Sequence, residues 1–205
     1  MPDLFIPKFL SQIKSLVGKH HSLYPKIPPQ GIFFESLVER AFIASGWTQD
    51  QVILTTPNSP QHDLLVGTTK LSVKTETGKG TRLNQISITK LCTTEAGTWA
   101  ISPLIEHALR HLTRYAHILM LRAVWETGHI HYQVLDIPLD LLRLMKTAKI
   151  SEVGRRPGRR SLAGRVISDG ETVFRVHFDG ADGKCQIHGL LVGRCKMLLE
   201  WDQPL

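Results

Sequence analysis

Residues 62–76 read HDLLVGTTKLSVKTE, the pattern of a strand, a tight polar turn and a second strand. Successive side chains of a strand point to opposite faces of its sheet. On the second strand, Ser72, Lys74 and Glu76 therefore share one face. A second acid, Asp63, stands at the start of the first strand. The hairpin thus presents a lysine and carboxylates together on a sheet.

A lysine held among carboxylates in a sheet is costly unless each charge is paired or solvated. Hydrolysis of a phosphodiester bond gives such a group a use. Carboxylates hold a hard divalent cation, while the lysine orients or polarises the attacking water and stabilises the developing negative charge. The alternative without a catalytic role is an ordinary ion pair on an exposed sheet face, which contributes little to the stability of the fold.

The pattern resembles the PD-(D/E)xK nuclease superfamily, to which most type II restriction endonucleases belong. Pro60 and Asp63 would stand for its first half-motif, and Lys74 for its lysine. The chain departs from the family at Ser72, which occupies the place of the usual Asp or Glu two residues before the lysine. Either the second acid comes from elsewhere or the site is not catalytic.

Two glutamates are candidates for the missing acid. Glu76 lies on the same strand face, one pleat beyond Lys74. Glu35 lies in the segment GIFFESLV, which resembles the helix that precedes the hairpin in this superfamily. Since Glu35 sits at the border of that helix's apolar stripe, it is equally compatible with a solvated side chain.

The resemblance also implies roles for the other residues. Asp63 would ligate Mg²⁺, with the Val73 carbonyl as a second ligand and Glu76 or Glu35 completing the shell. Lys74 would position or help to deprotonate the attacking water, and Ser72 would only form a hydrogen bond. A type II restriction enzyme would act as a homodimer whose two sites cut opposite DNA strands.

The chain is basic, with 25 Lys and Arg residues against 18 Asp and Glu and a net charge of +7. Such a balance indicates a polyanionic partner, nucleic acid before membrane, and no stretch is long and apolar enough to span a bilayer. Cys92, Cys185 and Cys195 are odd in number and widely spaced, which speaks against a zinc or redox motif. We therefore expect a protein of the reducing cytoplasm.

Periodicity and turn residues predict the elements. Helices are expected at about residues 4–18, from Gly31 to Gly46, and at 101–115 and 139–145. Strands are expected at 52–55, in the hairpin, at 118–124 and 130–137, and then at 162–167, 173–178, 185–188 and 196–201. Residues 86–92 fit a short helix or a strand equally well.

These elements predict an α/β fold with a restriction-endonuclease-like mixed β-sheet flanked by helices. The Glu35 helix would cover one face of the sheet and the 101–115 helix the other. Residues 1–150 would form the nuclease core and residues 151–205 a small β-rich lobe that contacts DNA, the two making one compact unit.

Residues 146–165 contain seven basic residues and a single acid, Glu152. Glycines and a proline keep part of this segment irregular, so we expect a mobile arginine loop. Guanidinium groups match both phosphate oxygens and guanine edges. DNA contacts are predicted for Arg155, Arg156, Arg159 and Arg160, and for Lys79 and Arg82 in the polar loop at 78–84. The alternative is a solvated basic linker.

The function predicted from the sequence is Mg²⁺-dependent hydrolysis of double-stranded DNA by a sequence-specific type II restriction endonuclease. Two alternatives remain open. One is a structure-specific or repair nuclease of the same fold. The other is a non-catalytic DNA-binding module in which Ser72 marks a decayed site.

Overall fold

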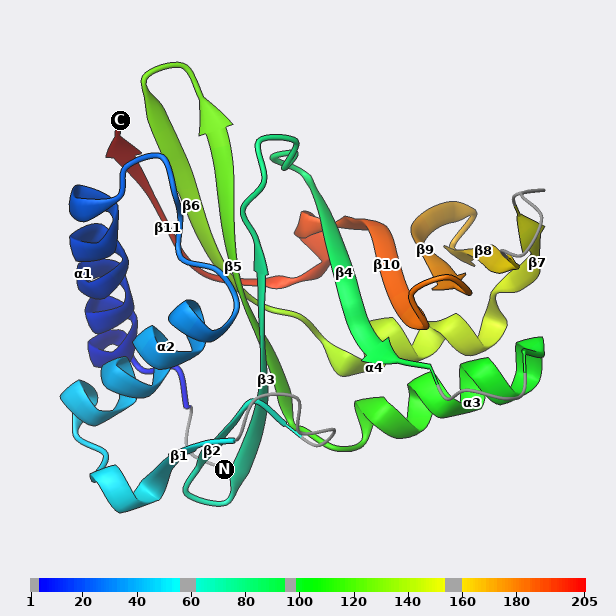
Figure 1. Ribbon diagram of the computed structural model, residues 1–205, viewed down its shortest axis with the longest axis horizontal. Coiled ribbons are helices and arrows are strands. Elements are labelled where there is room, and N and C mark those ends of the chain that lie inside the picture. Colours follow the sequence, from blue (N-terminus) through cyan, green and yellow to red (C-terminus); the bar gives the residue numbers. More distant parts are fainter. Residues whose placement is uncertain (1–3, 56–61, 95–98, 154–159) are drawn as a thin grey trace. The chain divides into compact units, whose positions relative to one another are not determined.

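The computed structural model describes residues 4–55, 62–94, 99–153 and 160–205 (Figure 1). The chain forms two compact units. The first comprises Met1–Thr81, Tyr115–Ile137 and Lys196–Leu205, and the second Arg82–Arg114 and Pro138–Cys195. The two units therefore interleave along the sequence.

The first unit contains a six-stranded sheet in the order β1-β2-β3-β5-β6-β11. Its strands are β1 (Val52–Leu54), β2 (Leu64–Val66), β3 (Thr69–Glu76), β5 (His117–Glu126), β6 (His129–Asp136) and β11 (Lys196–Pro204). β3 and β5 are parallel and the other neighbours antiparallel, so the predicted mixed sheet is confirmed. The predicted hairpin is β2 and β3, and its turn contains Gly67 at a φ of 58°, which a residue without Cβ adopts readily.

Helices α1 (Pro7–Leu23) and α2 (Ile32–Ser45) pack with this sheet through one apolar core. Alternation on β5 places Leu119 and Leu121 in that core. α2 ends at Gly46 as predicted, with a φ of 120°. The prediction that α1 ends near Gly18 is wrong: α1 continues to Leu23 and buries His21, whose ring bonds to the β11 backbone.

The second unit contains a five-stranded antiparallel sheet in the order β4-β10-β9-β8-β7. Its strands are β4 (Gln85–Thr93), β7 (Lys149–Val153), β8 (Ser161–Ser168), β9 (Glu171–Asp179) and β10 (Lys184–Leu191). β4 resolves the open choice for residues 86–92 in favour of a strand. β7 was not predicted, because its alternating pattern lies within the basic segment.

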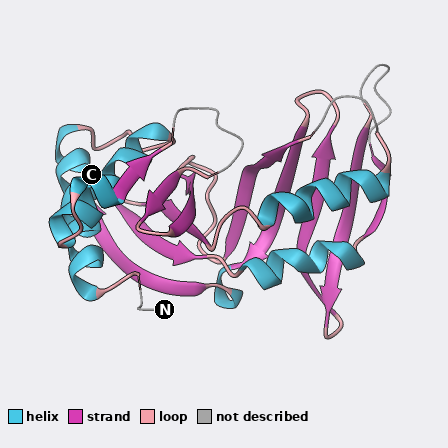
Figure 2. Cartoon of the chain, turned by 90° about the horizontal axis from the view of Figure 1, so that it is seen from below, coloured by secondary structure: helices cyan, strands magenta, loops and turns pink. Residues whose placement is uncertain are grey.

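Helices α3 (Ile101–Leu112) and α4 (Leu139–Arg143) lie on one face of this second sheet (Figure 2). α3 buries Leu104, Ala108 and Leu112, the apolar stripe visible in the sequence. The expectation that this helix covers the other face of the hairpin's sheet is therefore wrong, since α3 belongs to the second unit. The stripe predicts a buried helix face but does not say which sheet covers it.

The last strand returns to the first unit. β11 pairs with β6 from Lys196 opposite Asp136 to Pro204 opposite His129. Trp201 stacks on Tyr132 with ring centroids 5.1 Å apart. Strand 196–201 thus completes the sheet that carries the hairpin. None of the helices in the described ranges has both the length and the apolar character needed to cross a membrane.

Candidate active site

Asp63 lies at the point where the two strands of the hairpin part. Backbone pairing between them reaches Leu64 opposite Leu71, and the Asp63 N–H adds a bond of 2.9 Å to the Leu71 carbonyl. Beyond this point the Asp63 side chain replaces a strand partner, because its Oδ2 accepts the Val73 N–H at 2.6 Å. The carboxylate is therefore fixed against the middle of β3.

Two side chains of β3 donate to the same oxygen. Ser72 Oγ and Lys74 Nζ each lie 3.0 Å from Asp63 Oδ2. Within the described ranges, no residue donates to Asp63 Oδ1. One carboxylate oxygen is thus fully used in holding the residue in place, and the other remains for a further partner.

Lys74 also donates to the Val73 carbonyl oxygen, at 3.2 Å. Its ammonium group therefore lies between the Asp63 carboxylate and a backbone carbonyl that β2 does not cover. The two charged side chains are 20% exposed for Lys74 and 28% for Asp63, so solvent and a ligand still have access. The predicted Asp63, Val73, Lys74 and Ser72 come together at one point.

Glu35 lies on α2, close enough for the charges of Asp63 and Lys74 to act on its carboxyl group. The start of α2 lies against β3, where the Gly31 N–H donates to Thr75 Oγ1 at 3.4 Å. Burial raises the pKa of the Glu35 carboxyl group, the nearby Asp63 charge raises it further, and the Lys74 ammonium group opposes both. The Glu35 backbone N–H donates to the Gly31 carbonyl at 3.0 Å, but no described residue forms a hydrogen bond or ion pair with its carboxylate. Its carboxylate is half-buried near a like charge without a cation of its own.

Glu76 has a different environment. Its carboxylate accepts a hydrogen bond of 2.8 Å from the Arg122 guanidinium group. Arg122 is fully buried, lies opposite Glu76 on the neighbouring β5, and also donates to Gln133 on β6. The strand-face prediction for Ser72, Lys74 and Glu76 holds, but the carboxylate at the end of this face is paired inside the protein.

The chain matches the model of a known protein family over most of its length. The model of a family described as SmaI, type II site-specific deoxyribonuclease, matches residues 2–203. The chain belongs to the SmaI family. The type II restriction enzyme SmaI of Serratia marcescens is 30% identical over 174 residues, which cover 83% of this chain and 68% of that enzyme. No solved structure matches the chain significantly.

Membership of the SmaI family confirms the predicted type II site-specific deoxyribonuclease, a restriction endonuclease with DNA as its substrate. It also confirms the resemblance to type II restriction endonucleases, and the observed mixed α/β architecture agrees with it. Enzymes of this kind require a divalent metal ion.

The Arg122 contact to Glu76 was missed by the sequence analysis of this SmaI-family chain. One signal was available. Residues 118–124 read ILMLRAV, a run that is apolar except for Arg122. A guanidinium group in a strand buried on both faces requires a buried acceptor. The pattern predicts that a partner exists, but it does not identify Glu76 and Gln133.

The residues predicted to contact DNA are only partly described in this SmaI-family structure. Arg155, Arg156 and Arg159 lie outside the described residues, as does Pro60 of the half-motif. Arg160 is exposed at the start of β8. Lys79 lies 5.8 Å from the centre of the Trp125 ring, and Arg82 donates to Gln85 at 3.4 Å. The DNA contacts of all these residues stay predictions.

Proposed function

We propose that this chain cleaves double-stranded DNA with Mg²⁺ held by Asp63, Glu35 and the Val73 carbonyl. The observation that carries the proposal is the environment of Glu35. Its carboxylate lies near Asp63 and Lys74, has a raised pKa and has no described partner. A divalent cation between Glu35 and Asp63 would relieve the repulsion between the two carboxylates.

The donor set fits Mg²⁺ better than a softer metal. Carboxylate and carbonyl oxygens are hard ligands, and Mg²⁺ is commonly held by one or two carboxylates together with water and substrate phosphate. In the described part of the chain, no three His, Cys, Asp or Glu side chains gather into a metal site. An open site with two carboxylates and one carbonyl agrees with this finding.

Glu76 is the weaker candidate for the second acid. Releasing its carboxylate toward a metal would leave the guanidinium group of Arg122 buried without its ion-pair partner. Breaking a buried pair in this way typically costs about 3–5 kcal/mol. We therefore assign Glu76 to the structure of the sheet and Glu35 to the site, which chooses between the two alternatives left open by the sequence.

Each residue then has a defined task in hydrolysis. Bound Mg²⁺ would polarise the scissile phosphate and lower the pKa of a coordinated water. Lys74, held at 3.0 Å from Asp63, orients the attacking water and stabilises the charge that develops on the phosphate oxygens. Ser72 holds the Asp63 carboxylate in place. The water loses a proton as its oxygen bonds to phosphorus, and the leaving oxygen takes up a proton as its bond to phosphorus breaks.

The other parts of the proposal follow from the family. A type II enzyme that cuts both strands of a short palindrome is served by two equivalent sites, so we propose a homodimer. We also propose that the protein acts in the cytoplasm, where a reducing environment keeps Cys92, Cys185 and Cys195 out of disulfide bonds.

Plasmid cleavage across a Mg²⁺ series tests the metal assignment. Glu35→Gln is expected to lower the cleavage rate by about 100-fold or more, because it removes a charge that acts on the metal. Lys74→Ala is expected to do the same with the fold intact. Glu76→Gln is the matched control, since it makes the same change on the other glutamate. Normal cleavage by Glu35→Gln, together with an inactive but folded Glu76→Gln, would reverse the assignment.

A further inference from the structure

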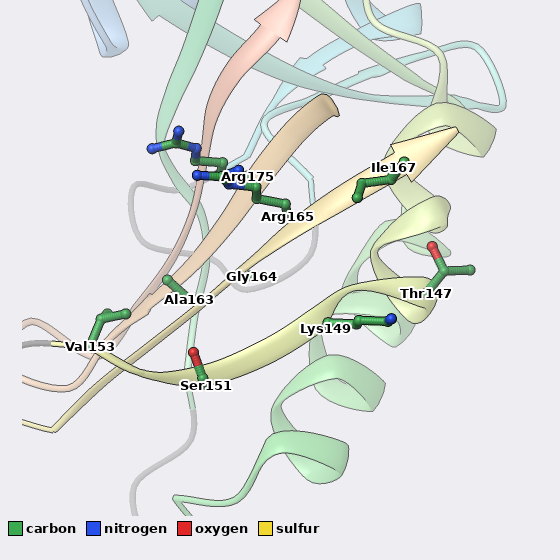
Figure 3. Close-up of a pocket in the computed structure, with 9 residues that line it drawn as sticks. All are labelled: Thr147, Lys149, Ser151, Val153, Ala163, Gly164, Arg165, Ile167 and Arg175. Atoms are coloured by element: carbon green, nitrogen blue, oxygen red, sulfur yellow. The ribbon is translucent and has the colours of Figure 1, made fainter. Parts of the chain in front are cut away.

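A row of positive charges crosses the second sheet. Lys149 on β7 lies opposite Arg165 on β8, and Arg165 lies opposite Arg175 on β9. Directly opposite residues of an antiparallel sheet project from the same face, so the three side chains form one line across three neighbouring strands. We call Lys149, Arg165 and Arg175 the cation row (Figure 3).

The cation row is open to solvent and carries no compensating acid. All three side chains are exposed, and no described acidic residue lies within ion-pair distance of them. They line a hollow of about 700 Å³ together with Thr147 and Ser151, without any carboxylate among its lining residues. Figure 3 shows Arg165 and Arg175 side by side along this surface.

A histidine lies beside the cation row on a fourth strand. His188 on β10 lies opposite Arg175. Burial lowers the pKa of His188, and the neighbouring His177 and Arg175 lower it further. The charge of Arg175 therefore acts on His188, and the lowered pKa favours the neutral ring. Like charges placed directly opposite one another destabilise a sheet, so this arrangement is unfavourable unless an anion shares it.

We propose that the cation row binds the phosphate backbone of duplex DNA, an inference that rests on the proposed nuclease function. Neighbouring strands lie about 4.8 Å apart, so the row is about 10 Å long and the five-stranded face about 19 Å wide. A face of that width does not enter a major groove of about 12 Å. It meets the phosphates at the outside of the duplex, where lysine and arginine act without reading sequence.

This proposal extends the DNA contacts beyond the predicted loop. Lys79, Arg82 and Arg160, which the sequence predicts to contact DNA, lie outside the named strands, whereas the cation row is fixed on three hydrogen-bonded strands. Helices α3 and α4 cover the opposite face of the same sheet, so the strands that carry the row are packed on that side. The backbone positions of its three residues are therefore set by the sheet.

Salt-dependent binding tests the proposal. We suggest Lys149→Gln, Arg165→Gln and Arg175→Gln, singly and together, in a full-length Asp63→Asn background that binds without cutting. Affinity for a random-sequence duplex is measured between low and moderate salt. Each single change is expected to reduce the log-log salt slope by about one unit, and the triple change by about three.

Lys184→Gln and Arg143→Gln are matched controls in the same unit. Each removes one positive charge, but these residues are paired with Asp182 at 3.1 Å and Asp140 at 2.6 Å. The controls are expected to leave the slope within about half a unit of the parent. Equal slopes for the row variants and the parent overturn the proposal.

Further outcomes distinguish a failure of the row inference from a failure of the proposed nuclease function. If the row variants lose affinity only for DNA that the wild type cleaves, the row reads bases and the phosphate assignment is wrong. If the wild type cleaves DNA while every row variant binds normally, the row inference fails and the function stands. A parent chain without DNA affinity overturns both.

Discussion

Glu35 and Glu76 show how environment divides two identical side chains between tasks. Both were candidates for the missing acid, and both lie near β3. Glu76 accepts a hydrogen bond of 2.8 Å from the fully buried guanidinium group of Arg122. The charges that act on Glu35 are instead the carboxylate of Asp63 and the ammonium group of Lys74. A paired carboxylate stabilises the fold, while an unpaired one beside a like charge is suited to bind a cation.

Ser72 provides a prediction at this scale. Its hydroxyl group is one of three donors to Asp63 Oδ2, alongside the Val73 N–H and Lys74 Nζ. Ser72→Ala removes one of them, a loss of about 1.5 kcal/mol, and is expected to slow plasmid cleavage by about tenfold at most. An inactive, folded Ser72→Ala protein in a Mg²⁺ titration would show that the hydroxyl group acts in the chemistry.

The elements were predictable where the pattern was local. The hairpin, α2 with its glycine stop and the largely apolar β5 follow from periodicity and turn residues. β7 was missed because its alternation includes Lys149 and Glu152, charges that also suit a loop. The partner of α3 was missed because an apolar stripe predicts burial but not the surface that covers it.

The candidate site was also predictable only where its residues are close in sequence. Asp63, Ser72, Val73 and Lys74 lie on one hairpin, so sequence spacing brings them together. Glu35 comes from a separate helix, and its proximity to Asp63 depends on how α2 packs on β3. The ion pair between Glu76 and Arg122 joins residues on two strands that are distant in sequence, which a linear pattern does not specify.

Stability measurements test the structural role given to Glu76. Glu76→Ala leaves the Arg122 guanidinium group buried without its ion-pair partner, which is expected to lower the free energy of unfolding by about 3–5 kcal/mol. Replacing both partners, as in Glu76→Leu with Arg122→Met, is expected to recover most of that loss. Urea unfolding followed by circular dichroism measures both. A Glu76→Ala protein as stable as the wild type would remove the structural explanation.

On the scale of the whole molecule, the two units share one chain that crosses between them at residues 81, 114, 137 and 195. The sheet with Asp63 is completed by β11, far along the sequence. His21 of α1 bonds to the Pro204 carbonyl at 2.7 Å and to the Tyr132 hydroxyl group at 3.1 Å. Helix, sheet and last strand are thereby joined at one place.

Trp201 tests whether β11 supports the nuclease unit. The side chain is 7% exposed and stacked on Tyr132, so Trp201→Ala is expected to lower the free energy of unfolding by about 3–5 kcal/mol. Met197→Ala, on the same strand but 36% exposed, is the control and is expected to change it by about 0.5 kcal/mol or less. Equal stability of both variants in thermal unfolding would contradict this role.

The late position of β11 has a consequence for protein synthesis. During translation, the strand that completes the Asp63 sheet emerges only after the second unit has been made. Pairing it with β6 also closes a long loop, and such non-local contacts form slowly. A nascent chain therefore holds Asp63 and Lys74 in an unfinished sheet until residues 196–204 have left the ribosome. For an enzyme that cuts DNA, this order of assembly delays activity until the second unit and residues 196–204 have been made.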